Sequence, residues 1–231
     1  MKAILLIFAS FISANLLAQE IRREISSFKY LKVSRGIEVT LVKSDAKEVI
    51  INLHGLDAED LIVLNKNDEL IIKVSTNFIW HDMDHNHWRV RVEVPFQYLA
   101  GIESTTGAKI ISKDLIKSDD LEIDVSAGAE AELRVDAKTL YVEASMGSEI
   151  KLEGTADFLN VRASMGSEAN LKYLSAMKVK AKSAMGATIL VLATDEFSGS
   201  VTMGGEILVS GNPEKFSKNE SMGGDIRLRS N

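Results

Sequence analysis

Three of the four histidines lie in one short segment, residues 80–88, together with two aspartates. Imidazole nitrogen and carboxylate oxygen are both good ligands for zinc and copper, so this segment has the residue types of a transition-metal site. The candidate ligands are His81, Asp82, Asp84, His85 and His87. The alternative is a polar hairpin tip between two strands, and on that interpretation no cofactor is expected. A divalent cation is the one candidate cofactor that the sequence leaves open.

Acidic side chains recur at one point of a repeated pattern in the second half of the chain. The set comprises Glu130, Glu149, Glu168, Glu206 and Asp225. If the copies stack as neighbouring strands, some of these carboxylates lie about 5 Å apart. Like charges at that separation destabilise a sheet, and a bound cation or a neighbouring lysine or arginine would relieve the repulsion. We favour a solvated face that discourages aggregation.

Hydroxyl side chains recur in the same way, each two residues before a glycine. The set comprises Ser126, Ser145, Ser164, Thr202 and Ser221. Stacked beside the glycines, these residues would make a flat face of small side chains. Such a face could receive a glycan or another protein, or it could simply be a compact way to turn a corner.

The sequence has no motif that indicates catalysis. It contains no G-x-S-x-G elbow, P-loop, dinucleotide-binding glycine pattern or H-E-x-x-H, and it has no cysteine. We therefore do not expect an enzyme. Solenoids of parallel strands can carry clustered acids that cleave polysaccharides, so a glycan-binding or carbohydrate-active protein is the alternative, by analogy of fold alone. The formal net charge of −6 makes binding to nucleic acid phosphates unfavourable.

Residues 1–18 have the pattern of a secretory signal peptide. Lys2 gives a positive start, a run of apolar and small residues follows, and Ala18 precedes Gln19 at a plausible cleavage point. The apolar run is shorter than the roughly 20 residues of a spanning helix, so no transmembrane span is expected after cleavage. We expect an exported protein, either periplasmic, associated with the outer membrane or extracellular, whose residues 19–231 form one domain.

The positions of these residue sets follow from a repeat. From residue 102 onward, seven four-residue segments can be superimposed, and their glycines are 21, 19, 19, 20, 18 and 19 residues apart. A constant short period indicates a solenoid in which each copy is one rung. Within a rung, apolar and polar residues alternate with the period of a strand. The sequence therefore predicts an all-β, right-handed, single-stranded parallel β-helix over residues 102–231, preceded by a strand-rich part of the same domain over residues 19–101.

The alternation also predicts which side chains face inward. Five of the seven repeats have a methionine before the glycine, and it has the same parity as the apolar residues on both sides of it, such as Leu140 and Ile150. We therefore expect one continuous thioether column in the core, because methionine adapts to irregular gaps. The column would comprise Met146, Met165, Met185, Met203 and Met222.

The signal peptide, the opening Val33–Thr40 and the Ser-Met-Gly-Ser/Gly rungs together resemble the putative auto-transporter adhesin "head GIN domain" family. The likeness covers residues 28–228. It implies a right-handed parallel β-helix and an exported protein of Gram-negative bacteria, especially of the Bacteroidetes group. The family name implies adhesion, although the family's biochemical role is not established. The chain carries no segment with the pattern of an auto-transporter barrel, which would need at least eight strands of about 9–11 residues.

Taken together, these patterns predict an exported, non-enzymatic module that displays side-chain ladders to a protein or glycan at the cell envelope. A metal-binding envelope protein using the His81–His87 segment is a further alternative. The last rung would leave an unpaired edge after Leu228, and an unpaired edge invites another strand. We therefore also expect a homo-oligomer formed through the C-terminal edge.

Overall fold

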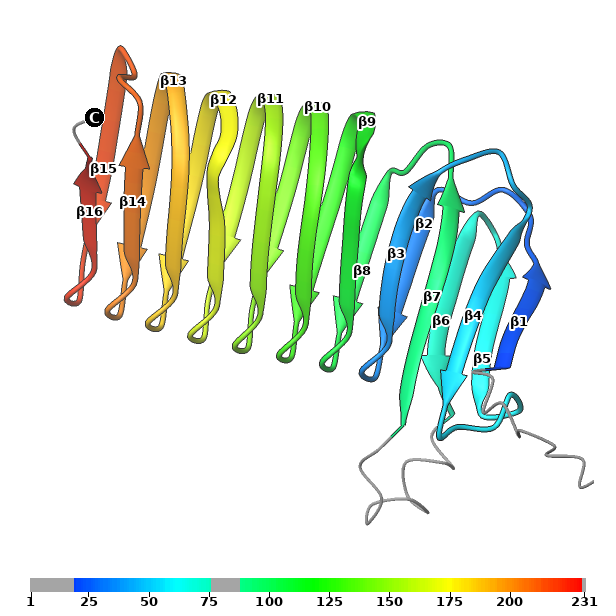
Figure 1. Ribbon diagram of the computed structural model, residues 1–231. Coiled ribbons are helices and arrows are strands. Elements are labelled where there is room, and N and C mark those ends of the chain that lie inside the picture. Colours follow the sequence, from blue (N-terminus) through cyan, green and yellow to red (C-terminus); the bar gives the residue numbers. More distant parts are fainter. Residues whose placement is uncertain (1–18, 76–87, 230–231) are drawn as a thin grey trace, which may run out of the picture.

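The computed structural model describes residues 19–75 and 88–229 (Figure 1). The predicted signal peptide and the predicted metal ligands His81, Asp82, Asp84, His85 and His87 lie outside these ranges. The described residues contain sixteen strands and no helix, so the all-β prediction is confirmed. The expected solenoid with a rung of about 19 residues is confirmed as well.

Each central rung is one long strand that bends over and returns. The strand climbs one side of the solenoid, bends at the upper edge in Figure 1, and descends the other side to a tight turn at the lower edge. Neighbouring rungs pair in parallel and in register, so Leu140 lies beside Leu159 and Val142 beside Val161. These strands are β9 (Lys109–Ser126), β10 (Glu130–Ala144), β11 (Glu149–Ala163), β12 (Glu168–Ala184) and β13 (Thr188–Thr202).

The tight turns between rungs, which we call the tips, are two-residue turns with both central residues at positive φ. In the tip Ser145–Ser148, Met146 has φ 52° and Gly147 has φ 69°. The N–H of Ser148 donates to the carbonyl of Ser145 at 3.3 Å, which closes a type I′ turn. Glycine suits the second central position because it adopts positive φ without steric cost.

The N-terminal part extends both sides of the solenoid as a two-layered cap. On one side β9 is followed by β3 (Glu38–Lys43), β7 (Arg89–Phe96), β4 (Glu48–His54) and β1 (Gln19–Glu24). On the other side β9 is followed by β8 (Gly101–Thr105), β2 (Tyr30–Ser34), β6 (Glu69–Val74) and β5 (Leu61–Lys66). The pairs β1–β4, β4–β7 and β5–β6 are antiparallel, so the regular parallel stacking ends here.

An eighth tip joins β2 to β3. Arg35 and Gly36 have φ 66° and 69°, as in the other tips, and the N–H of Gly36 donates to the carbonyl of Thr106 at 3.1 Å. This copy of the repeat was not recognised in the sequence. Its Ser34-Arg35-Gly36-Ile37 pattern was the available signal, but it stands far from the next copy at Thr105.

One hydrophobic cluster runs through the interior from the cap to the last rungs. Its columns stack identical or similar side chains, for example Leu121, Leu140 and Leu159, which are all fully buried. Burying a side chain of this size contributes about 1.5–3 kcal/mol, so the columns hold the rungs together without disulfides.

The predicted methionine column is wrong. The five methionines occupy the first central position of their tips, and they are 46–75% exposed. Ala144 and Ser148, on either side of Met146, do point inward, so the parity of the strands is correct. The alternation rule assumes extended backbone, whereas two consecutive residues at positive φ turn the chain outward between them.

The last rung is built differently from the rungs before it. It consists of β14 (Glu206–Ser210), β15 (Lys215–Glu220) and β16 (Asp225–Leu228). In register, Lys218 pairs with Gly199, and Glu220 pairs with Val201. Lys218 and Glu220 thus stand at positions that are apolar and buried in earlier rungs, such as Val142 and Ala144.

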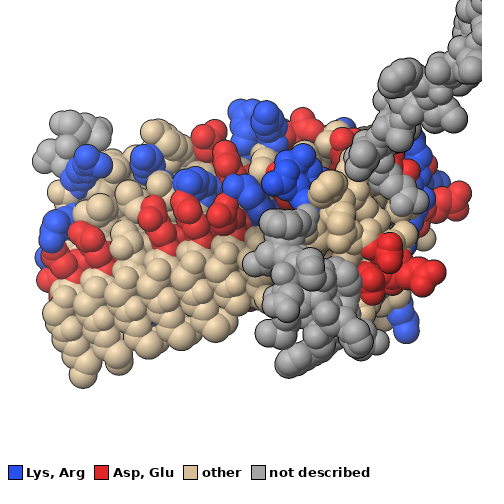
Figure 2. Space-filling view, turned by 60° about the horizontal axis from the view of Figure 1, so that its bottom comes forward, with Lys and Arg blue, Asp and Glu red and all other residues tan. Residues whose placement is uncertain are grey.

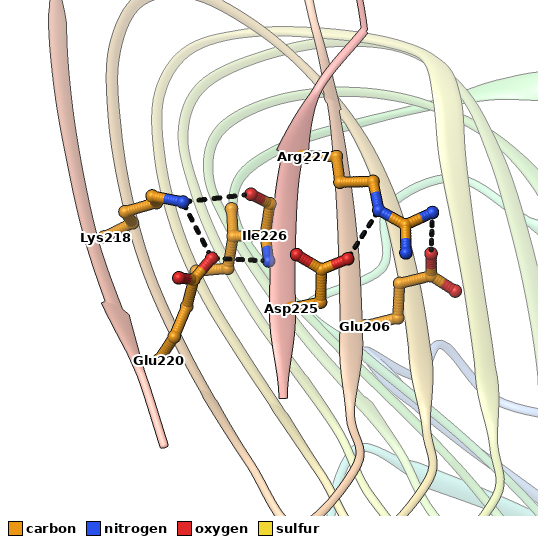
Figure 3. Close-up of polar contacts among 6 residues, drawn as sticks. All are labelled: Glu206, Lys218, Glu220, Asp225, Ile226 and Arg227. Carbon is orange, nitrogen blue, oxygen red and sulfur yellow. Dashed lines mark hydrogen bonds and ion pairs between the residues drawn. The ribbon is translucent and has the colours of Figure 1, made fainter. Parts of the chain in front are cut away.

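Figure 3 shows how these two charged side chains close the end of the stack. The Nζ of Lys218 donates to the Oε1 of Glu220 at 2.8 Å and to the carbonyl of Ile226 at 3.5 Å. The same Oε1 accepts the N–H of Ile226 at 2.8 Å. These contacts lower the pKa of Glu220 below its usual range, mainly through the bond from Lys218 and then through the bond from Ile226. Inward-pointing charges of this kind protect an edge from further pairing.

Candidate functional site

The most regular surface of the molecule lies along the tips. Figure 2 shows a flat array without charged side chains along the solenoid, bordered on one side by a row of acidic residues. We call this surface the tip face. It comprises the first three residues of seven tips: 105–107, 126–128, 145–147, 164–166, 184–186, 202–204 and 221–223. None of these residues is a lysine, arginine, aspartate or glutamate.

A ladder of backbone hydrogen bonds holds the tips in register. Before the last tip, the N–H of each tip glycine donates to a carbonyl of the next tip, that of the residue just before its glycine. Examples are the bonds from Gly147 to Met165 at 3.1 Å and from Gly166 to Met185 at 3.1 Å. Buried serines brace the tips from inside, because the Oγ of Ser148 donates to the carbonyl of Val125 at 2.8 Å. The tip face is therefore a stiff lattice rather than a set of independent loops.

The predicted hydroxyl set lies on this face, at the first position of each tip. These side chains are half-buried, apart from the exposed Ser221 at the end of the stack: Ser126, Ser145, Ser164, Thr202 and Ser221. The Oγ of Ser126 donates to the Oγ1 of Thr105 at 3.2 Å. The methionines at the second position project furthest, and we call them the methionine row: Met146, Met165, Met185, Met203 and Met222.

The predicted acidic set lies at the border of the tip face. The residues are Glu130, Glu149, Glu168, Glu206 and Asp225. Basic side chains lie across several of them. Lys109 contacts Glu130 at 2.6 Å and Lys151 contacts Glu149 at 2.5 Å. Hydrogen bonding to Glu149 is the largest cause of the raised pKa of Lys151.

Arg227 lies across the last two members of this acidic row. It contacts Asp225 at 2.5 Å and Glu206 at 3.4 Å, as Figure 3 shows. The repulsion expected within the row is thus partly neutralised by the chain's own cations. In the described part of the chain, no group of three or more histidine, cysteine, aspartate or glutamate side chains could hold a metal ion.

A second surface lies on the side of the molecule formed by β6, β2, β8, β9, β10 and β11. It is an open groove, seen as two adjoining hollows of about 330 and 360 Å³. Tyr30 lines one of these hollows and Tyr141 the other, and we call the surface the tyrosine groove. Its remaining polar lining includes Glu103, Glu122, Asp124, Glu143 and Arg162. No sequence motif predicts this groove, because its residues follow no common pattern and are brought together only by the register of the rungs.

Asp124 is the most perturbed carboxyl of this groove. It pairs in register with Glu103 on one side and Glu143 on the other. Partial burial raises the pKa of Asp124 above its usual value, and the neighbouring carboxylates of Glu143, Glu103 and Glu122 raise it further. An aromatic platform beside carboxyl groups is suited to hydrogen bonding and stacking with a neutral polar ligand.

Comparisons with known proteins agree with this architecture. The family model described as "Putative auto-transporter adhesin, head GIN domain" matches residues 27–213. A search of curated proteins found no match. In the described residues, no helix is long and apolar enough to cross a membrane.

Several solved structures are similar in fold. A "putative adhesin" from Bacteroides fragilis is 18% identical with a TM-score of 0.77, and the match covers 91% of this chain and 97% of that one. A "putative adhesin" from Parabacteroides merdae is 14% identical with a TM-score of 0.72, over 92% and 96% of the two chains. A "putative lipid binding protein" from Parabacteroides distasonis is 16% identical with a TM-score of 0.68, also over 92% and 96%. At these identities the likeness establishes the fold alone.

Proposed function

Because this chain belongs to the family described as putative auto-transporter adhesin, head GIN domain, we propose that it is an exported, non-enzymatic, adhesin-like module of the cell envelope. Its task is to present the tip face to a protein or glycan partner. The solenoid supplies stiffness, and the repeating tips supply many similar small and apolar side chains along one line.

The observation that carries this proposal is the tip face itself. An uncharged flat strip with exposed methionines contrasts with the charged surface that adjoins it in the view of Figure 2. Exposed apolar patches rimmed by polar residues mark interaction sites, and methionine is favoured where one surface must adapt to a partner. Many weak contacts in one rigid array also bind more strongly together than singly.

The test is a binding experiment on a charged tip variant. Wild type, Met165→Lys/Met185→Lys and Met177→Lys are applied to a glycan array and to immobilised mucin, fibronectin and lipopolysaccharide. Met177 is the matched control, because it is 46% exposed, like Met165 and Met185, but lies within β12, away from the tips. We expect wild type and Met177→Lys to bind a common partner, and the tip variant to lose at least tenfold in affinity.

Two results would contradict the proposal. The first is a partner that the tip variant binds as well as wild type does. The second is the appearance of new reducing ends when the protein is incubated with polysaccharides, because that would make it an enzyme. The envelope location has its own check, since a tagged chain in its native host should fractionate with the periplasm, the outer membrane or the medium.

A second candidate is glycan binding in the tyrosine groove. The exposed rings of Tyr30 and Tyr141 and the intervening carboxylates favour it. On the same array, Tyr141→Ala should then abolish binding while the tip variant retains it. The cap pocket beside Phe28 and Phe96 has about 220 Å³, which is below the roughly 300–1,000 Å³ of typical ligand pockets. It therefore gives no support to the lipid-binding name of one structural neighbour.

A further inference from the structure

The methionine row occupies a position where the fold does not require methionine. All five residues have φ between 49° and 52°, a region in which glycine, asparagine and aspartate are favoured and other side chains are strained. Arg35, Thr106 and Ala127 occupy the same position in other tips and make the same turn. Neither turn geometry nor core packing therefore accounts for five successive exposed thioethers.

The spacing of the row matches a specific coordination geometry. The tips are held together by the glycine ladder, as from Gly186 to Met203 at 3.1 Å and from Gly204 to Met222 at 3.2 Å. Successive methionines are therefore about one strand spacing apart, which is about 4.8 Å. Metal–sulfur bonds are about 2.3 Å long. Two sulfurs held at the backbone spacing of the tips would therefore have room for one ion with two opposed sulfur ligands.

The surroundings also suit a cation. Thioether sulfur is a soft ligand that selects Cu(I) among the common biological metals. It is not protonated in water, so no proton competes for it. The acidic row borders the tip face (Figure 2), and the chain carries a net charge of −6, so the local potential attracts cations.

We propose that the methionine row binds soft monovalent cations, Cu(I) and its analogue Ag(I), between the sulfurs of adjacent rungs. This site is separate from the predicted histidine site, uses a different class of ligand, and does not depend on the adhesive role. Four adjacent pairs exist among five methionines, and neighbouring pairs share a sulfur. The row therefore holds about two ions at saturation.

Two measurements test the site. In the first, Cu(I) kept reduced with ascorbate under nitrogen is titrated in competition with bathocuproine disulfonate. The proteins are wild type, Met165→Leu/Met185→Leu/Met203→Leu and Met177→Leu. Leucine keeps the apolar volume but removes the sulfur. We expect wild type and Met177→Leu to bind about two ions, and the triple variant to bind at least tenfold more weakly.

The second measurement is made on wild type, with the Met177 resonance identified by its absence in Met177→Leu, and so does not depend on how well the triple variant folds. Wild type labelled with ¹³C at the methionine methyl groups is titrated with silver nitrate. The methyl resonances of the row should shift at the first two equivalents, while that of Met177 should not. The proposal is overturned if wild type does not compete for Cu(I), if the triple variant binds as wild type does, or if Met177 shifts together with the row. Loss of metal binding with unchanged partner binding in the triple variant would separate this site from the adhesive function.

Discussion

At the scale of single residues, the acidic side chains differ in what they do to stability. In the row beside the tips, several carboxylates contact a lysine or an arginine. In the tyrosine groove, Asp124 stands between Glu103 and Glu143 in the register of the sheet. The pKa of Asp124 is raised by burial first and by these neighbours second. Its folded form therefore holds a proton at a pH where the unfolded chain has released it.

This shift predicts how stability depends on pH. Because the folded pKa of Asp124 lies above the unfolded pKa, stability falls as pH rises through the interval between the two, and the loss is complete once the pH exceeds the folded pKa. Asp124→Asn should therefore be more stable than wild type at pH 7, by an amount that solvent screening keeps small. The gain should vanish near pH 3, where the carboxyl is protonated in both states.

Thermal melts of both proteins from pH 3 to pH 8 measure this difference. Asp119→Asn is the control, because the Asp119 carboxylate is stabilised by Lys138, which contacts it at 2.7 Å. It should give no gain at pH 7. An equal gain in both variants would mean that lower overall charge, and not the position of Asp124, is responsible.

At the scale of elements, the tips and the bends use glycine for different reasons. Gly147, in a tip, has φ 69°, and a methyl group added there would meet nothing within 4 Å. Gly154 lies where β11 bends, with φ 125°, and a Cβ built on it would stand 1.9 Å from the carbonyl oxygen of Val135. Tips therefore need only a positive φ, whereas this bend also needs close approach of two backbones.

Alanine substitutions should separate these two requirements. Gly147→Ala should cost about 1 kcal/mol, the usual penalty of a side chain in the left-handed region. Gly154→Ala should cost about 3 kcal/mol or more, because the backbone of a neighbouring rung must move. Chemical denaturation followed by circular dichroism measures both. Equal losses would show that the bend relaxes easily and that close approach there is unimportant.

At the scale of the whole molecule, the two ends of the solenoid are closed in different ways. The N-terminal end is covered by the antiparallel strands of the cap. The C-terminal end is closed by the inward-pointing Lys218 and Glu220, which bind the backbone of Ile226. Repeat proteins need such capping units to remain soluble. The homo-oligomer expected from an open C-terminal edge stays a prediction, and the Lys218–Glu220 pair acts against it.

Removing this pair should make the chain associate end to end. Lys218→Val/Glu220→Val restores apolar side chains in the two core columns, so the exposed end can stack on another copy. In sedimentation velocity we expect the variant to form more dimers or longer species than wild type does at the same concentration. Glu214→Val/Lys215→Val makes the same change of composition at exposed positions nearby and should associate no more than wild type. If Lys218→Val/Glu220→Val associates no more than wild type does, the pair has no capping role.

The sequence by itself determined the architecture and the period. Alternating apolar residues that return every 19 residues can bury themselves only by stacking in register, so the parallel solenoid and most inward-facing residues, such as Leu140 and Ile150, were predictable. The hydroxyl set lies in the tips and the acidic set at their border, and the roles of both sets stay predictions.

Only the tertiary structure decided the direction of the methionines, the eighth tip at Arg35 and Gly36, and the charged end at Lys218 and Glu220. Each depends on something that alternation does not encode. Two residues at positive φ reverse the side-chain direction inside a tip. A rung assembled from β2 and β3 joins the stack across a long separation in sequence. Lys218 and Glu220 can occupy core columns because no further rung covers them in the described chain, so their charges remain in contact with water.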